Sequence, residues 1–86
     1  MSRQVPEVRL SLGRALRRIR RERELSQEAL ADRAGLSTNY VSEIERAMKD
    51  ASFMTVVHLA DALGMTLPEL MRAFDQERAR HVESGS

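Results

Sequence analysis

Apolar residues recur along most of this chain at the spacing that defines one face of an α-helix. In the first such segment, Leu12, Leu16 and Ile19 occupy positions i, i+4 and i+7. The segment begins near Val8, after a non-helical lead-in at Val5-Pro6. No stretch alternates apolar and polar residues as a strand does, and strong helix formers dominate the chain. The pattern therefore predicts an all-α fold.

Serine and glycine residues mark the ends of two short helices in the middle of the chain. Ser26 is a typical cap for a second helix, which Gly35 ends because glycine adopts the left-handed conformation at little cost. After a very short connection, Ser37 caps a third helix. Two short helices joined by a tight turn predict a helix-turn-helix over Gln27 to Arg46.

Two further helices follow. Ser52 caps a fourth helix that Gly64 ends, and Thr66 with Glu69 forms a capping box at the start of a fifth. The polar stretch 75–86 either frays from the fifth helix or stays disordered. We expect one domain over residues 8–74, with flexible or partly helical tails at 1–7 and 75–86. The expected core consists of Leu12, Leu16, Ile19, Leu30, Val41, Ile44, Val56, Leu59, Leu63 and Leu70.

Composition places the chain among small globular proteins. Its 86 residues are 42% apolar and 31% charged, which is typical of a single globular domain. The absence of cysteine excludes disulfides and cysteine zinc sites, and it agrees with a reducing compartment. The N-terminus lacks the apolar core of a signal peptide, and no run of apolar residues is long enough to span a membrane. We therefore expect a cytoplasmic protein with no membrane partner.

The charges are unevenly distributed. Residues 1–46 carry ten Lys and Arg against seven Asp and Glu, whereas residues 47–86 carry four against six. The first half is therefore basic, at +3, and the second half is acidic, at −2. This asymmetry indicates one face for DNA and a separate face for another contact.

Enzymatic function finds no support in the sequence. The two histidines, His58 and His81, lie far apart and belong to no cluster with the spacing of metal ligands. The sequence shows no glycine-rich phosphate-binding loop, and it supports no catalytic set of serine, histidine and aspartate. We expect no enzyme activity, no metal and no cofactor.

One long run of residues resembles a known family. The segment from Leu25 to Ser37, followed by Tyr40 to Arg46, is similar to the lambda-repressor-like, or XRE-type, helix-turn-helix family. The resemblance continues from Leu59 to Leu70 and backward to Leu12, Leu16 and Ile19, so about 60 to 65 residues are covered, more than a short motif match. The chain departs from the family pattern at Ala47, where the family usually has glycine, and at Asp50-Ala51, where it often has Asn-Pro.

The resemblance implies a five-helix DNA-binding domain that regulates transcription. A repressor that binds a palindromic operator on double-stranded DNA as a homodimer is the function it favours. Small members of the family include phage and plasmid repressors and the controllers of restriction-modification systems, and the sequence does not separate these classes. The alternative is an antitoxin-like or adaptor module whose main partner is a protein, although such modules also bind DNA.

In a helix-turn-helix, the first residues of the third helix enter the major groove. Asn39 can bond both N6 and N7 of adenine, and the Thr38 methyl group can contact that of thymine, although either residue can instead be a helix cap. One turn later, Ser42 can bond several bases and Glu43 can accept from cytosine, unless Glu43 faces solvent or pairs with an arginine. We predict base contacts from these four residues.

Phosphate contacts are expected around the two short helices. Gln27 begins the second helix, where its amide and the helix N-terminus can both bind a phosphate. For Tyr40, a phosphate contact and a partly buried ring are equally favoured. The resemblance implies that Arg20 pairs with Glu45, and Arg20 is also a candidate phosphate ligand. The expected phosphate contacts are Gln27, Ser37, Tyr40, Arg46 and Arg20.

A second copy of the chain is the expected protein partner. The fifth helix carries a stripe of apolar residues that is wider than one small core needs. We predict that this stripe forms the homodimer interface; the alternative is that it packs entirely within its own subunit. Its residues are Leu67, Leu70, Met71 and Phe74.

Overall fold

Capping residues determine where the helices begin. The hydroxyl oxygens of Ser26, Ser37 and Ser52 accept hydrogen bonds of 3.0–3.1 Å from backbone N–H groups three residues later. The Thr66 N–H donates to the Glu69 carboxylate at 2.8 Å, and the Glu69 N–H donates back to the Thr66 hydroxyl at 3.2 Å. The starts of the second to fifth helices, which were predicted from these caps, are confirmed.

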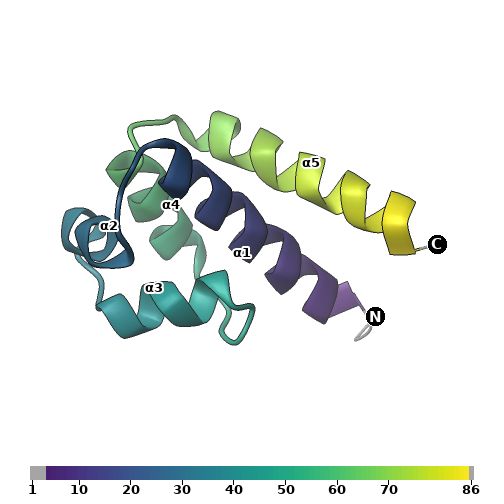
Figure 1. The fold of residues 1–86 in the computed structure, drawn as a ribbon, viewed down its shortest axis with the longest axis horizontal. Coiled ribbons are helices and arrows are strands. Elements are labelled where there is room, and N and C mark those ends of the chain that lie inside the picture. Colours follow the sequence, from purple (N-terminus) through teal and green to yellow (C-terminus); the bar gives the residue numbers. More distant parts are fainter. Residues whose placement is uncertain (1–3, 86) are drawn as a thin grey trace.

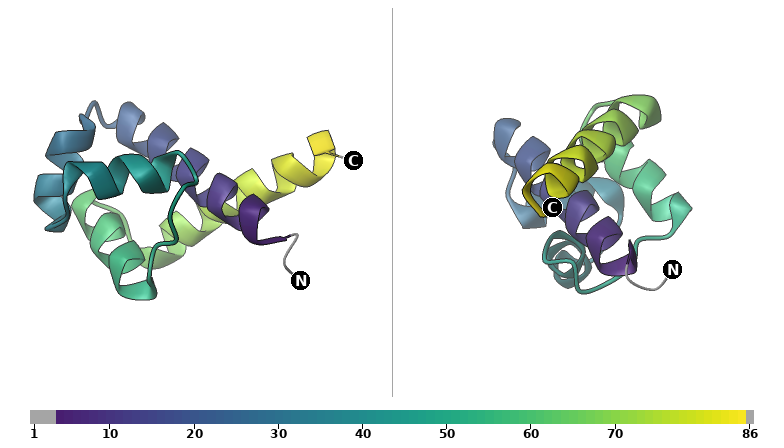
Figure 2. Two further views of the ribbon diagram at one scale, coloured as in Figure 1. Left: turned by 90° about the horizontal axis from the view of Figure 1, so that it is seen from below. Right: turned by 90° about the vertical axis from the view of Figure 1, so that its right-hand side faces the viewer.

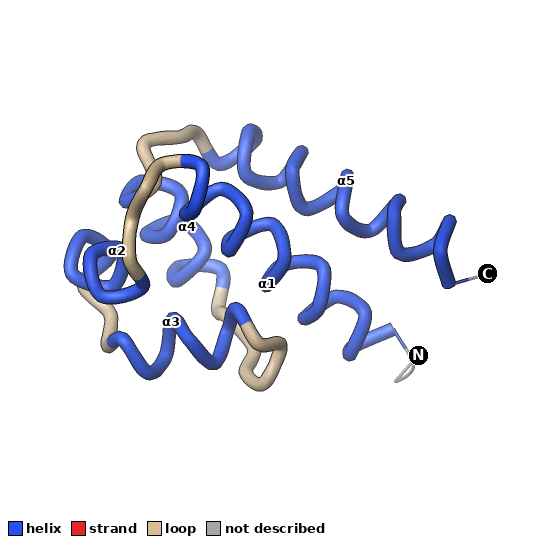
Figure 3. The backbone as a smooth tube through the Cα atoms, viewed as in Figure 1, coloured by secondary structure: helices blue, strands red, loops and turns tan. Residues whose placement is uncertain are grey.

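The computed structural model describes residues 4–85, and five α-helices occupy this part of the chain (Figure 1). Short loops connect them (Figure 3). The all-α prediction is confirmed. The helices are α1 (Gln4–Glu22), α2 (Gln27–Ala34), α3 (Thr38–Glu45), α4 (Phe53–Ala62) and α5 (Leu67–Gly85).

The two long helices and the three short ones have different roles. α1 and α5 run side by side in opposite directions, while α2, α3 and α4 gather at one end of this pair (Figures 1 and 2). α3 packs against both α1 and α2. α3 therefore rests on two other helices.

The expected core is confirmed in nearly every member. Nine of the ten predicted residues are buried, and Leu12 is partly buried against them. Small residues complete the core between the larger side chains: Ala15, Ala31, Ala34, Ala60, Ala62 and Ala73.

Both long helices extend beyond their expected ends. α1 begins at Gln4, so the predicted non-helical lead-in is wrong within the described residues. Pro6 lies in the first turn of α1, where the N–H that proline lacks has no helical partner anyway. α5 continues past Phe74 to Gly85 because Glu77 is buried in this stretch, where it accepts from Arg18 of α1 at 3.4 Å. Residues 1–3 and 86 lie outside the described part.

Two further observations concern residues 4–85. None of their helices is both long and apolar enough to cross a membrane. These residues also contain no group of three or more His, Cys, Asp and Glu side chains that could hold a metal ion.

Candidate nucleic-acid interface

The turn between α2 and α3 is built on one glycine. Gly35 has a φ of 70°, in the left-handed region, and its N–H reaches the carbonyl groups of Ala31 and Asp32. The Leu36 N–H donates to the Ala31 carbonyl at 2.9 Å, and the Leu36 side chain packs on the core. Ser37 then starts the next helix at once. The turn is therefore short and well anchored at both ends.

The two sides of α3 are chemically different. Val41 and Ile44 are each 2% exposed and face the core. Thr38 and Asn39 are exposed on the first turn, and their side chains make no hydrogen bond to the described residues. Ser37, and not Asn39, supplies the cap. Both predicted base readers therefore stand at the surface with free donors and acceptors.

The other two predicted base readers lie one turn further along. Ser42 and Glu43 are half-buried, and the carboxylate of Glu43 has no ion-pair partner among the described residues. Arg46, which follows α3, is exposed and has no acidic partner in this part of the chain either. The polar side of α3 thus extends along the helix to a cation at its end.

A buried carboxylate joins three helices beside the recognition helix. The Arg20 guanidinium donates to the two oxygens of Glu45 at 2.7 and 3.0 Å, and to the Leu25 carbonyl at 2.7 Å. The Gln27 amide donates to the same carboxylate at 3.0 Å. The network links α1, α2 and α3, so the pairing that the resemblance implied is present. The sequence did not indicate that Gln27 joins it.

This network changes the expectation for Arg20. Its side chain is only 10% exposed, and its guanidinium is directed at Glu45 and Leu25. In the structure Arg20 therefore braces α1 against α3 with three of its five N–H donors, and its phosphate contact stays a prediction. Gln27 is half-buried and uses one of its two amide protons on Glu45, which leaves the second for another acceptor.

α1 and α3 approach closely at Gly13. A Cβ atom at this position would lie 2.5 Å from the Glu45 carbonyl oxygen and 2.7 Å from that of Ile44. Only glycine fits at this distance. The helical pattern did not predict this contact, although a glycine inside such a pattern is a signal of close packing.

Tyr40 contacts the loop that follows α3. Its hydroxyl donates to the Asp50 carbonyl at 3.0 Å, and the ring packs partly on the core. The Arg9 guanidinium of α1 also donates to the Asp50 carboxylate, at 2.6 Å. Of the two readings of Tyr40, the structure favours the partly buried ring, because the phenolic proton that a phosphate would need is already donated.

The same loop has two unexpected features. Ala47 has a φ of 62°, a conformation that L side chains rarely adopt, at the position where the family usually has glycine. Met48 in the loop, and Phe53 and Met54 in the first turn of α4, are 57–67% exposed. Neither feature followed from the apolar periodicity, because that pattern assigned no side-chain direction to the loop or to this first turn.

The expected dimer stripe on α5 is divided between two environments. Leu70 is completely buried within this chain, where α5 packs on α1 and α4, so the expectation that it lies at an interface is wrong. Leu67, Met71 and Phe74 are half-buried. The Phe74 ring lies 5.7 Å from the Arg78 guanidinium.

A helix that turns its polar side outward, held from behind by a second helix across a tight turn, defines the helix-turn-helix class of DNA-binding proteins. Within that class, the chain belongs to the family described as the helix-turn-helix domain, whose model matches residues 11–74. The predicted family is thereby confirmed.

Individual relatives agree with this assignment. The chain is 36% identical over 70 residues to the uncharacterized HTH-type transcriptional regulator y4dJ of Sinorhizobium fredii, a match that covers 81% of this chain and 91% of the relative. It is also 36% identical over 62 residues to the immunity repressor protein of Bacillus phage phi105, covering 72% of this chain and 43% of that protein.

A solved structure shows the same fold. The restriction-modification controller protein C.AhdI from Aeromonas hydrophila is 37% identical in sequence and superposes with a TM-score of 0.70. The match covers 72% of this chain and 94% of that protein. The five-helix prediction is therefore confirmed both by the helices themselves and by a relative of known structure.

Proposed function

We propose that this protein is a cytoplasmic transcriptional repressor that binds a palindromic operator as a homodimer. One observation carries the proposal. The first turn of α3 exposes Thr38 and Asn39 with unused hydrogen-bonding groups, while the opposite side of the helix is buried in the core. Such a helix is rigidly held, and its free polar groups suit the base edges of the major groove.

Phosphate contacts on either side of α3 support this function. The second amide proton of Gln27, the hydroxyl proton of Ser37 and the exposed guanidinium of Arg46 are each available to a phosphate oxygen. These groups fix the register of a protein on DNA but do not read sequence. Ser42 and Glu43 complete the proposed base contacts.

The homodimer is proposed through the half-buried side of α5. One recognition helix contacts too few bases for operator affinity, and a two-fold axis would set two of them about 34 Å apart, one turn of DNA. Leu67, Met71 and Phe74 remain available for that contact, whereas Leu70 belongs to the core. Similarity to an immunity repressor and to a controller protein supports both the DNA target and the regulatory role.

Selection of binding sites from a random duplex library tests the function. We expect enrichment of a palindrome with half-sites one helical turn apart, followed by a footprint at that sequence upstream of a regulated gene. A reporter placed behind the site should be repressed. Absence of any enriched sequence would contradict operator recognition, and stoichiometric co-purification of an unrelated protein would instead favour an interaction module.

The interface is tested separately by sedimentation. Phe74→Asp should yield a folded monomer with weak operator affinity, because a carboxylate in place of the ring removes the apolar contact and is costly to bury at the axis. The matched control is Gln76→Asp, which adds the same charge at an exposed position of α5 and should leave the dimer intact. A dimeric Phe74→Asp variant would place the interface elsewhere.

A further inference from the structure

α5 carries two neighbouring stripes of covered side chains. Leu70, Ala73 and Glu77 are buried within the chain, where α5 packs on α1 and α4. Beside them runs a stripe whose members are only half-buried and whose steps alternate between four and three residues, the spacing at which two helices pair side by side. We call it the outer stripe, and it consists of Leu67, Met71, Phe74, Arg78 and His81.

The outer stripe extends beyond the matched domain. The family model ends at residue 74, whereas α5 continues to Gly85. We call residues 75–85 of α5 the arm. The arm runs beside the first half of α1 and projects past the three short helices (Figures 1 and 2). Part of the outer stripe therefore lies on an element outside the matched domain.

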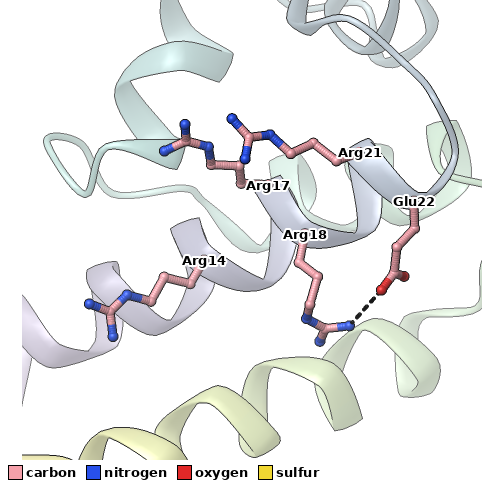
Figure 4. Close-up of a pocket in the computed structure, with 5 residues that line it drawn as sticks. All are labelled: Arg14, Arg17, Arg18, Arg21 and Glu22. Atoms are coloured by element: carbon pink, nitrogen blue, oxygen red, sulfur yellow. Dashed lines mark hydrogen bonds and ion pairs between the residues drawn. The ribbon is translucent and has the colours of Figure 1, made fainter.

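Contacts within one chain cover the arm only thinly. Among the arm side chains that the structure describes, Glu77 alone is buried. Arg18 points from α1 toward α5 (Figure 4) and donates to Glu77 at 3.4 Å, and Arg78 donates to Glu7 at 3.3 Å. Each pair has one partner that is 33–41% exposed, and water weakens such pairs. Val82 is 64% exposed, so the arm carries apolar surface that its own chain leaves open to solvent.

The area that a dimer needs also points to the arm. A stable interface buries about 800 Å² on each partner, and even an aromatic side chain supplies at most about 150–250 Å². Leu67, Met71 and Phe74 are largely covered by their own chain, so their remaining surface is less than half of that area. The arm prolongs the same face of α5 by about 16 Å.

We propose that the α5 helices of two copies pair antiparallel across the two-fold axis, so that each arm covers the first half of the partner's α5. This inference rests on the proposed homodimer. With Phe74 near the axis, Val82 lies opposite the partner's Leu67. Arg78 lies opposite the partner's Met71, where its methylene stem packs on apolar surface. A parallel pair would instead set Arg78 against the partner's Arg78, which like charges disfavour.

Chemical cross-linking tests the orientation, because this chain contains no cysteine. In Leu67→Cys/Val82→Cys, a short bis-maleimide should join two chains, since the two positions lie about 22 Å apart on one helix and cannot be bridged there. Each single variant should stay uncross-linked. Cross-linking of Val82→Cys by itself would mean a parallel pair, and a dimeric double variant that gives no product would place the arm outside the interface. Either result overturns the proposal.

Sedimentation measures what the arm contributes. Val82→Asp should raise the dissociation constant of the dimer by about tenfold or more, because an apolar contact is lost at both ends of the helix pair and a carboxylate is costly to bury. Ala79→Asp adds the same charge at an exposed position outside the outer stripe and should leave the constant unchanged. An unchanged constant for Val82→Asp beside a monomeric Phe74→Asp would overturn this proposal alone, whereas a monomeric wild type would overturn the proposed homodimer as well.

Discussion

Arg20 of α1 and Glu45 of α3 form a two-pronged ion pair that is almost completely buried, with side-chain exposures of 10% and 2%. Water cannot replace either partner at this depth. The pair does more than fill space, because Glu45 also accepts from Gln27 at the start of α2. The orientation of the recognition helix thus depends on one carboxylate.

Removal of one partner should therefore be costly. Arg20→Ala leaves the Glu45 charge buried without its main donor, and we expect unfolding free energy to fall by about 3–5 kcal/mol. Urea denaturation measures the loss. Arg14→Ala, at an exposed position of the same helix, is the control and should change little. A loss of under about 1 kcal/mol for Arg20→Ala would mean that the pair behaves as a surface pair.

Gly13→Ala tests the close approach of α1 and α3. The added methyl group would meet the Glu45 carbonyl oxygen at 2.5 Å, so the helices must separate. We expect a destabilisation of about 1–3 kcal/mol, as for other overpacked sites, together with weaker DNA binding. Arg14→Ala at the next, exposed position controls for the helix itself. A fully stable Gly13→Ala variant would contradict the close approach.

Ala47→Gly should stabilise the protein. Ala47 has a φ of 62°, where a Cβ atom is strained, and glycine removes that strain. We expect thermal or urea unfolding to show a gain of about 0.5–1 kcal/mol, after the greater unfolded-state freedom of glycine is subtracted. The same substitution at Ala79, inside α5, should instead cost about 0.5–1 kcal/mol. If both substitutions changed the unfolding free energy in the same direction, the interpretation that Ala47 is strained would be contradicted.

Asn39→Ala separates base reading from helix capping. Because Ser37 supplies the cap, stability should not change. Binding to the selected operator should weaken by about 1–3 kcal/mol, with relaxed preference at one base pair per half-site. Gln76→Ala is the exposed amide control. If Asn39→Ala lost affinity equally on operator and random DNA, as competition binding would show, Asn39 would not be a base reader.

Acid sensitivity should arise in part at Glu7. A 2.6 Å hydrogen bond from the Ser11 hydroxyl, helped by the positive charge of Arg78 at 3.3 Å, holds the pKa of Glu7 below its ordinary value. A carboxyl group with a lowered folded-state pKa stabilises the fold above its unfolded pKa of about 4.3, and that stabilisation is lost as the pH falls through the folded pKa.

Glu7→Gln should therefore be less stable than wild type at neutral pH, and the difference should shrink below about pH 4. Urea denaturation at a series of pH values measures it. Glu28→Gln, at an exposed position of α2, should give a curve parallel to wild type. If the difference in unfolding free energy between Glu7→Gln and wild type did not change with pH, Glu7 would have the same pKa in the folded and unfolded states.

Much of the fold follows from local chemistry. Ser26, Ser37 and Ser52 cap their helices as the sequence predicts, because a cap needs only a hydroxyl and an N–H group three residues away. The core residues of α2, α3 and α4 follow from the helical period, which also depends only on residues close together in the sequence. The start of α1 and the end of α5 did not, because they are joined by contacts between residues far apart in sequence: Arg78 donates to Glu7 across 71 positions, and Arg18 donates to Glu77 across 59.

The candidate site divides in the same way. The sequence by itself determined the helix-turn-helix, its polar first turn at Thr38 and Asn39, and the family, since each depends on neighbouring residues. Only the tertiary structure decided that Arg20 is buried, that the Tyr40 hydroxyl binds the Asp50 carbonyl and that Leu70 belongs to the core. Side chains on different helices meet only when the helices pack, and a helical period gives the face of a residue but not what covers that face.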